Sequence, residues 1–462
     1  MNVALLADFG STFTKLLAVD LDEGAVVGQA QRPTQLHGEI LDSYEDAASD
    51  ALSEIGGSHR VALELAASSA GGGLRMAAIG LVPALTALAA KTAALHAGAR
   101  VECLLAGRLT KAHAERLRVV DPEIVLFAGG TDGGQESLVL ENASVVAESL
   151  PKAHVVVACN RDVAGDVEAL FRTVARSVQV VPNVLPELRS VSTEQARAAI
   201  SRVFIKHVIQ GKALSSSDRF GALVAMATPD AVLRAAQLQA EPDGAAERHA
   251  GVIVTDVGGA TTDVYSVVPR RPLQAADVHV KGLINLPVMR TAQGDLGIRS
   301  SAPTVLEADR LELDRRLGPG VGLSEACERR RAEPAKVFPK GSERTIDEAL
   351  AVSCMSRALE RHLGTRSVRV GAGGPPALIV EEPDLTSCRL LDAGGGILRA
   401  AAEPRALVRE SLQRLPAHSL APRHCGIVVD RHYVLAAAGL LCERHRDVAR
   451  ALLRKELPEV IS

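Results

Sequence analysis

Two short stretches of this chain, about 250 residues apart, follow nearly the same residue pattern. Each begins with an apolar run that ends in Asp, continues through a turn of Gly, Ser or Thr residues, and finishes with a second apolar run. The two copies span residues 3–19 and 252–268. Apolar runs rich in β-branched residues on either side of such a turn predict a β-hairpin. The pattern therefore predicts one hairpin of the same kind in each half of the chain.

The turns of both hairpins carry groups that suit phosphate. Glycine lets the backbone approach an anion closely, so that N–H groups can point at phosphate oxygens, and hydroxyl side chains add further donors. The candidate binding residues are Gly10, Ser11, Thr12 and Thr14 in the first copy and Gly258, Gly259, Thr261 and Thr262 in the second. Lys15 could neutralise phosphate charge as a point charge, although an exposed lysine at the start of a strand is also ordinary.

Each hairpin also places an aspartate at the end of its first strand. Asp8 and Asp256 are hard oxygen ligands of the kind that hold Mg²⁺ through its retained waters, which makes them candidate metal ligands and catalytic residues. One Asp-x-Gly turn would carry little weight, because such turns are common in hairpins. Two of them facing each other can clamp the β- and γ-phosphates of a nucleotide from opposite sides.

Composition excludes several classes of function. The chain has 462 residues, enough for two domains that each bury a core. A net charge of −3, 2% aromatic residues and no Trp give no basis for nucleic acid or an anionic membrane as a partner. Seven cysteines without a C-x-x-C pair match neither a disulfide framework, a zinc site nor an iron–sulfur site.

The chain also shows no targeting signal. The longest apolar stretch, 76–90, is interrupted by Gly80 and Pro83 and is too short and broken to span a bilayer. The N-terminus enters a strand directly instead of a signal peptide. We therefore expect a cytoplasmic protein.

From residue 61 to a helix that the capping box Ser192-x-x-Gln195 opens, strands alternate with helical patterns, which predicts an α/β sheet there. Glycine-rich runs follow two of these strands, at 68–73 and 129–134. In the second run, Asp132 is either a catalytic residue near the metal or the attacking water, or part of a tight turn at a sheet end. A polar, Gly/Pro-rich region at 317–344 predicts a surface insertion, and the Arg329-Arg330-Arg331 run within it predicts a solvated face.

The paired hairpins resemble the ATPase superfamily of actin, heat-shock chaperones and sugar kinases. The resemblance implies an actin-like α/β fold, in which two domains each have a mixed β-sheet flanked by helices and ATP lies in the cleft between them. Residues 1–250 and 251–462 would be the domains, with a C-terminal helix returning from the second. It further implies an adenosine-binding turn at Gly371, Gly373 and Gly374, a first connecting element at 160–162 with the helix after it, and a second connecting helix at 437–439, whose small residues permit a close crossing.

Nearly the whole chain resembles, more narrowly, the MutL-type accessory proteins associated with adenosylcobalamin-dependent glutamate mutase. The resemblance rests on residues 7–15, 68–74, 78–83, 127–134, 256–263, 290–297 and 436–441. It implies an ATP-binding, weakly ATP-hydrolysing and Mg²⁺-dependent chaperone or reactivating factor, with the mutase subunits as partners.

Three other functions on related folds remain open. A small-molecule kinase would need a carboxylate base, for which Asp132, Asp162 or Asp295 could serve, yet no set of sugar-reading polar residues accompanies them. An activator of a radical dehydratase would need cluster cysteines that this sequence lacks. Amide hydrolysis of the hydantoinase or oxoprolinase kind shares the second loop, but those chains are much longer.

Overall fold

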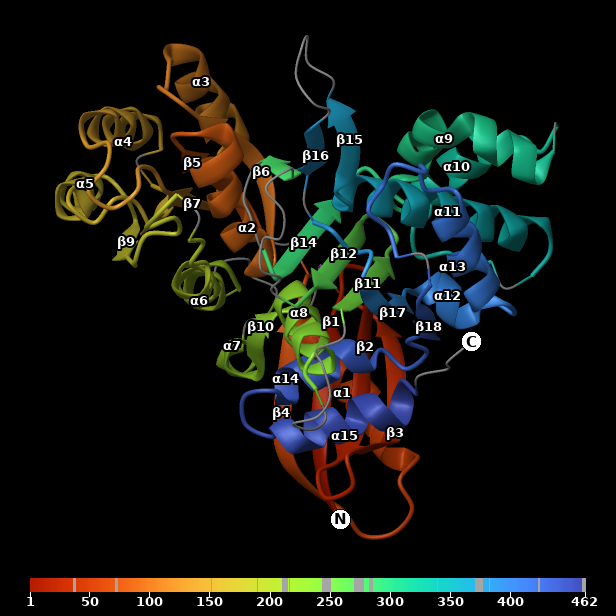
Figure 1. Cartoon of the computed structure of the whole chain (residues 1–462). Helices are drawn as coiled ribbons and strands as arrows, with labels where there is room; N and C mark the ends of the chain where they lie inside the picture. The colour runs from red at the N-terminus through yellow and green to blue at the C-terminus, as the bar shows by residue number, and fades with distance from the viewer. Residues whose placement is uncertain are drawn as a thin grey trace.

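The computed structural model shows a mixed α/β protein whose strands, within the described residues, form four sheets (Figure 1). The structure describes residues 1–35, 39–70, 74–150, 152–188, 190–209, 215, 217–242, 251–269, 278–281, 286–318, 320–338, 340–369, 377–381, 383–422 and 424–458. No helix within these ranges is both long enough and apolar enough to cross a bilayer. All seven cysteines are free thiols.

Two of the sheets repeat one strand order. In the first, β1 (Asn2–Phe9), β2 (Phe13–Asp20) and β3 (Ala25–Pro33) form an antiparallel meander, and β4 (Arg60–Ser68) and β10 (Val224–Ala227) continue parallel to β1. In the second, β11 (Gly251–Val257), β12 (Thr262–Val267) and β14 (Val288–Gln293) form the meander, and β17 (Cys388–Gly394) and β18 (Gly426–Val429) continue parallel to β11. The predicted hairpins are therefore confirmed, and so is the predicted fold of mixed sheets flanked by helices.

One apolar cluster joins the two repeated sheets. It contains Leu6 and Val19 from the first sheet, Val254 from the second, and side chains from helices α8 (Thr228–Gln239), α14 (Val434–Leu441) and α15 (Arg446–Glu456). Helices α8 and α14 cross closely, because a Cβ built on Gly439 would lie 1.9 Å from the carbonyl oxygen of Ala231. The expected close crossing at 437–439 is present, but its partner was predicted wrongly: α5 (Ala164–Arg172), the helix after 160–162, packs elsewhere.

Five helices build a second core beside the other repeated sheet. They are α9 (Ala302–Leu317), α10 (Leu323–Ala332), α11 (Ser342–His362), α12 (Gly396–Ala400) and α13 (Pro404–Gln413). The predicted insertion at 317–344 is therefore largely wrong, since α10 contributes Ala326 and Cys327 to this core. The solvated arginine run is also wrong in its middle residue: Arg330 is 0% exposed and pairs with Asp347.

A separate parallel sheet is inserted in the first repeat between β4 and β10. Its strands are β5 (Leu74–Gly80), β6 (Ala99–Ala106), β7 (Ile124–Phe127), β8 (His154–Val157) and β9 (Ser177–Val180), in the order β6-β5-β7-β8-β9. The helical segments of this part are η1 (Pro83–Ala87), α2 (Leu88–His96), α3 (Lys111–Val120), α4 (Ser137–Ser149), α5, α6 (Glu194–Val203), η2 (Phe204–Ile209) and α7 (Asp218–Leu223). The sequence predicted this alternation of strands and helices but not its separation from the first sheet.

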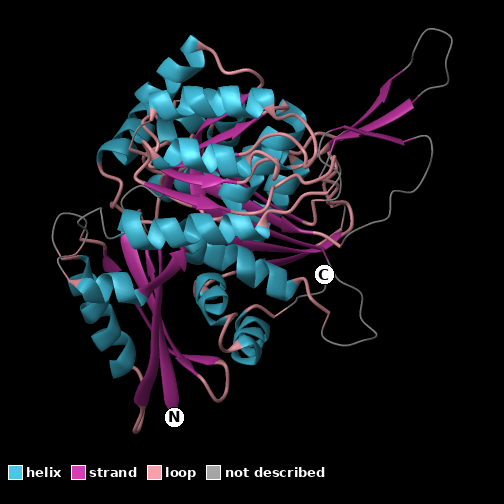
Figure 2. Ribbon diagram, turned by 90° about the vertical axis from the view of Figure 1, so that its left-hand side faces the viewer, coloured by secondary structure: helices cyan, strands magenta, loops and turns pink. Residues whose placement is uncertain are grey.

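The remaining elements lie at the periphery. Helix α1 (Ile40–Ser53) packs on β2 and β3 of the first sheet. Strands β13 (Val278–Lys281), β15 (Thr365–Arg369) and β16 (Ala377–Glu381) form a small sheet in the order β13-β16-β15, which projects from the body of the molecule (Figure 2).

Candidate nucleotide site

The two predicted turns have matching geometry. The Gly10 N–H donates to the carbonyl oxygen of Phe13 over 3.1 Å, and the Gly258 N–H donates to that of Thr261 over 2.8 Å. Because these N–H groups close the turns, Gly10 and Gly258 do not offer them to a ligand. Within the described part of the chain, the neighbouring N–H groups of Ser11, Thr12 and Gly259 have no acceptor, so the tips of both turns keep donors free.

Two of the predicted hydroxyl donors are used inside the fold instead. The Thr14 hydroxyl lies 3.0 Å from that of Thr34, and the Thr262 hydroxyl donates to the carbonyl oxygen of Leu296 over 2.8 Å. Both threonines are fully buried. Their predicted role as phosphate ligands stays a prediction, and Ser11, Thr12 and Thr261 carry the other predicted hydroxyls at the turns.

Asp8, Asp256 and Lys15 meet at the ends of the two hairpins. Asp8 lies opposite Lys15 in the β1–β2 register, with its Oδ2 3.7 Å from Lys15 Nζ. Its Oδ1 accepts a 2.5 Å hydrogen bond from the hydroxyl of Thr228 in the first turn of α8. Burial opposes the charge on Lys15, yet the nearby Asp8, Tyr433, Asp256 and Asp430 raise the pKa of this lysine. The fold therefore brings the paired aspartates of the two half-chains to one place.

The Asp256 carboxyl group has a raised pKa. Withdrawal from solvent raises its pKa to about 6; Lys15 opposes this shift, and Asp263 and Asp8 add to it. A carboxylate in this state loses its proton readily when a cation arrives. At neutral pH this carboxyl group is therefore mostly ionised.

Tyr433 and Asp430 belong to the same site, although sequence reasoning missed them. The Tyr433 ring contacts two cations, with Lys15 Nζ 3.8 Å and Arg399 Cζ 5.3 Å from its centroid. Tyr433 has a φ of 60°, a strained left-handed conformation for a non-glycine residue, directly before α14. Asp430 accepts N–H hydrogen bonds from Val434 and Leu435 in the first turn of that helix. An apolar run ending in Asp430 was the available signal, the same one that identified Asp8 and Asp256.

A glycine turn after β17 opens beside Asp256. A Cβ built on Gly394 would lie 3.5 Å from Asp256 Oδ1, and Gly395, with a φ of +120°, would place one 2.4 Å from the carbonyl oxygen of Val257. Only glycine fits such a close approach between β17 and β11. The expected adenosine turn at Gly371, Gly373 and Gly374 lies outside the described residues.

Asp392 is a further buried acid on β17, close to this turn. Burial and the neighbouring Asp430 raise its pKa well above the ordinary range, and Gln239 donates to its Oδ2 over 3.2 Å. Its Oδ1 is buried and has no hydrogen-bond partner among the described residues. Such an unmet acceptor is consistent with a carboxyl group that holds a proton.

Asp132 lies in a different part of the molecule, in the loop after β7 of the inserted sheet. Its Oδ1 accepts from the Arg161 N–H over 3.1 Å and from Asn183 Nδ2 over 2.9 Å. These bonds fasten neighbouring loops of the inserted sheet, and none of the hydrogen bonds described for Asp132 involves Asp8 or Asp256. Of the first glycine-rich run, Gly71–Gly73 lie outside the described residues.

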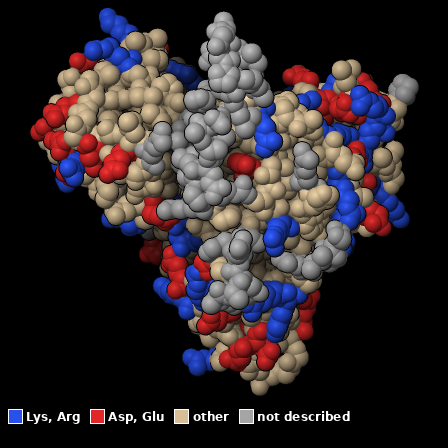
Figure 3. All heavy atoms as spheres, in the orientation of Figure 1, with Lys and Arg blue, Asp and Glu red and all other residues tan. Residues whose placement is uncertain are grey.

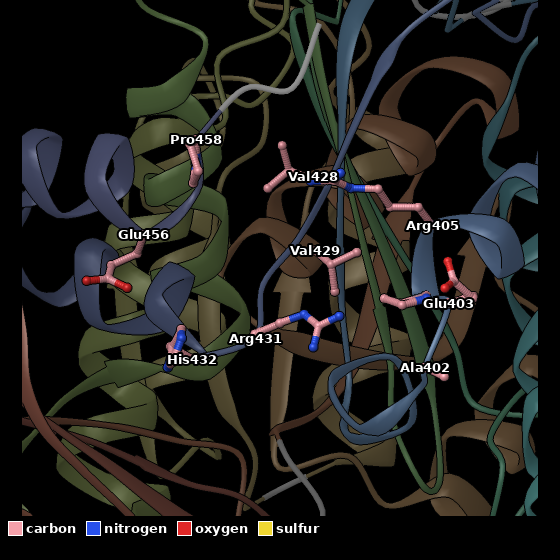
Figure 4. A pocket seen from close by; sticks show the side chains of 10 residues that line it. Ala402, Glu403, Arg405, Val428, Val429, Arg431, His432, Glu456 and Pro458 are labelled. Atoms are coloured by element: carbon pink, nitrogen blue, oxygen red, sulfur yellow. The ribbon is translucent and has the colours of Figure 1, made fainter. Parts of the chain in front are cut away.

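A cavity of about 370 Å³ lies next to the site, beyond the end of β18 (Figure 4). Glu403, Arg405, Arg431, His432 and Glu456 are its ionisable lining residues. None of the residues predicted to bind nucleotide lines it. On the face of the molecule in Figure 3, basic and acidic side chains are intermixed.

Comparisons with known proteins agree with the sequence-based resemblance. The family model described as "MutL protein" matches residues 4–457. The curated Protein MutL of Clostridium tetanomorphum is 36% identical over 466 residues, which cover 100% of both chains.

Solved structures resemble the chain more distantly. A nucleotide-free acetone carboxylase is 13% identical, with 95% of this chain and 70% of that one covered and a TM-score of 0.42. The ADPNP-bound activator of 2-hydroxyisocaproyl-CoA dehydratase from Clostridium difficile is 11% identical, with both chains covered completely and a TM-score of 0.30. Neither structure bears on the activity of this chain. The family match and the curated relative are decisive, and the chain belongs to the MutL protein family.

Proposed function

We propose that this chain binds Mg-ATP between its two repeated sheets and serves as an ATP-dependent chaperone or reactivating factor for an adenosylcobalamin-dependent mutase. The observation that carries the nucleotide part is the convergence of Asp8 and Asp256, from hairpins in opposite halves of the chain, on Lys15. The mutase part rests on family membership. We further propose that residues 1–250 and 251–462 are the two domains that close on the nucleotide.

The residues present fit a metal-bound nucleotide. Asp8 and Asp256 supply the one or two carboxylates with which Mg²⁺ usually binds alongside substrate phosphates. No group of three His, Cys, Asp or Glu side chains in the described ranges is placed to hold a metal ion by itself. The free N–H groups of Ser11, Thr12 and Gly259 suit phosphate oxygens. When bound, Mg²⁺ would neutralise phosphate charge.

Among the described residues, the turn of Gly394–Gly396 is a second candidate for the nucleoside site, in addition to the predicted turn at Gly371–Gly374. The turn of Gly394–Gly396 follows β17, the parallel neighbour of β11, and so opens at the same sheet edge as the second phosphate loop. Ligands of open α/β sheets bind outside the carboxyl ends of parallel strands, which is where this turn lies. The Tyr433 hydroxyl lies beside this turn, 3.6 Å from a Cβ built on Gly396.

The coupling to a partner follows from having ligands on both sheets. A nucleotide that contacts both hairpins binds a closed arrangement more tightly than an open one, and a partner that prefers one arrangement responds to it. Lys15, held against Asp8 and the Tyr433 ring, keeps the carboxylates compensated when no cation is bound. Thr228 and Asp430 link this site to the crossing helices α8 and α14.

The test is a calorimetric titration of mutase subunits into the protein with Mg-ADP, with Mg-ADPNP and without nucleotide. We expect the affinity for the mutase to differ among the three states. Equal affinities, together with rapid phosphorylation of a small metabolite, would replace this function by that of a small-molecule kinase.

A further inference from the structure

Arg290 on β14 links the second repeated sheet to the inserted parallel sheet. It is 5% exposed, and its Nε and Nη2 donate to Asp263 Oδ1 over 3.0 and 2.6 Å. Its Nη1 donates to the carbonyl oxygens of Leu95 over 2.6 Å and Ala99 over 3.4 Å. Leu95 lies in the last turn of α2 and Ala99 begins β6, so the arginine reaches from the second repeated sheet to the inserted one, where α2 lies beside β14 (Figure 1).

Asp263 carries the connection onward to the second phosphate loop. It lies opposite Asp256 in the β11–β12 hairpin, and its other oxygen, Oδ2, accepts from the Thr261 hydroxyl over 3.4 Å. Thr261, Asp263 and Arg290 thus form a continuous polar chain. One end is a hydroxyl at the tip of the phosphate turn, and the other end is the carboxyl terminus of α2.

Only arginine can make this set of contacts. Its planar guanidinium presents donors in fixed directions, and here they serve a carboxylate on one side and two carbonyl groups on the other. The carbonyl end of a helix carries partial negative charge, which strengthens such contacts with a cation. A lysine at this position has one ammonium group and cannot span both sides.

The interface that Arg290 crosses is shielded from solvent. His96, also in the last turn of α2, is 4% exposed, and burial, with Arg197 and Arg290, lowers its pKa to about 3. The imidazole is therefore neutral, and the guanidinium groups of Arg197 and Arg290 supply the positive charge near it. In such surroundings a small displacement of Asp263 has to be followed by Arg290 or by the carbonyl groups that it holds.

We propose that Arg290 is a positioning residue that transmits occupancy of the second phosphate loop to the inserted parallel sheet. This inference rests on the proposed nucleotide site. A phosphate that engages Thr261 competes with Asp263 for its hydroxyl, and the resulting shift passes through Arg290 to the end of α2. The inserted sheet thereby becomes the part of the molecule that reports nucleotide to a partner.

The test is hydrogen–deuterium exchange with and without Mg-ADPNP in the wild-type protein and in the R290K variant. In the wild type we expect nucleotide to change exchange in the peptide that covers the end of α2 by at least threefold. In R290K we expect that change to disappear while the Kd for Mg-ADPNP stays within about threefold of wild type. The matched control is R361K, because Arg361 makes an exposed pair with Asp295 near the end of β14; this variant should respond like wild type.

Asp263→Asn is a second variant that interrupts the polar connection from Thr261 to Arg290, and it replaces R290K as the test if R290K fails to fold. It should also lose the α2 response. A wild-type response retained in the folded variants, or nucleotide binding without any response at α2, would overturn this inference alone. Absence of nucleotide binding in the wild type would instead overturn the proposed function.

Discussion

Asp256 is held where its ionised form destabilises the fold. Its pKa of about 6, raised first by burial, exceeds the ordinary value of 3.8, so the folded state binds this proton more tightly than the unfolded chain. The favourable contribution of the protonated form is complete below pH 4 and is lost as the pH rises through 6. At pH 8 the ionised carboxylate therefore destabilises the fold, which a bound cation would offset.

We therefore predict opposite effects of D256N on stability and on binding. The variant should be more stable than wild type at pH 8, by on the order of 1 to 3 kcal/mol, and this gain should vanish at pH 4. Its Mg-dependent ATP binding should fall at least tenfold at pH 8, since the amide does not replace the charge. Urea denaturation at the two pH values and calorimetry at pH 8 measure these effects. Unchanged nucleotide affinity would remove Asp256 from the site.

The binding of wild type should itself depend on pH. Affinity for Mg-ATP should be constant above pH 7 and weaken as the pH falls through about 6, because the proton on Asp256 then competes with the metal. The matched measurement in D256N should show no such loss of affinity for Mg-ATP as the pH falls through about 6. An equal loss in D256N would assign the titration to another group.

At the level of elements, the arginine run of α10 contains both a buried and an exposed residue. Arg330 donates to Asp347 over 2.7 Å and to Glu343 over 2.8 Å, and both acids belong to α11. Arg331, one residue later, is exposed. We predict that Arg330→Met lowers the free energy of unfolding by about 1–3 kcal/mol, because Asp347 loses one of its two buried guanidinium partners and keeps only Arg299. Arg331→Met should change it by less than about 0.5 kcal/mol. Equal losses by urea denaturation would contradict the buried pairing.

The close crossing of α8 and α14 depends on the missing side chain of Gly439. A methyl group there would meet the Ala231 backbone, so Gly439→Ala should push the helices apart and displace Thr228 from Asp8. We expect a stability loss of more than about 2 kcal/mol together with weaker nucleotide binding. Gly165→Ala in α5 is the control, because nothing lies within 4 Å of its added Cβ; it should be neutral or stabilising by up to about 1 kcal/mol. Similar melting temperatures of the two variants would refute the close crossing.

These elements also show which features the sequence could predict. The paired hairpins were readable because an apolar run, an aspartate and a glycine turn are all local signals. Asp430 ends an equally apolar strand, but no glycine turn follows it to mark the site. The burial of Arg330 depends on Asp347, which only the packing of α10 on α11 brings near. The separate inserted sheet could not be foreseen, because local patterns predict strands but only long-range pairing decides which sheet each strand joins.

At the scale of the whole molecule, helices from the C-terminal part of the chain pack on the N-terminal sheet. Helices α14 and α15 come from the last 30 residues, yet they pack on β1, β3 and β4 of the first sheet. The cluster that joins the sheets places Leu452 and Leu453 of α15 with Leu6 and Val19. The first half of the chain therefore depends on the second for the cover of one face of its sheet.

This dependence gives a last prediction about autonomy. Residues 1–250 expressed alone should expose the apolar face that α14 and α15 normally cover, and such a large exposed patch favours aggregation. We expect this fragment to be insoluble or to lack a cooperative thermal transition. Co-expression with residues 251–462 should restore a soluble complex that binds Mg-ATP, since both phosphate loops and both crossing helices are then present. A 1–250 fragment that melts cooperatively at the temperature of the whole chain would show that the cluster between the sheets contributes little to the stability of the first half.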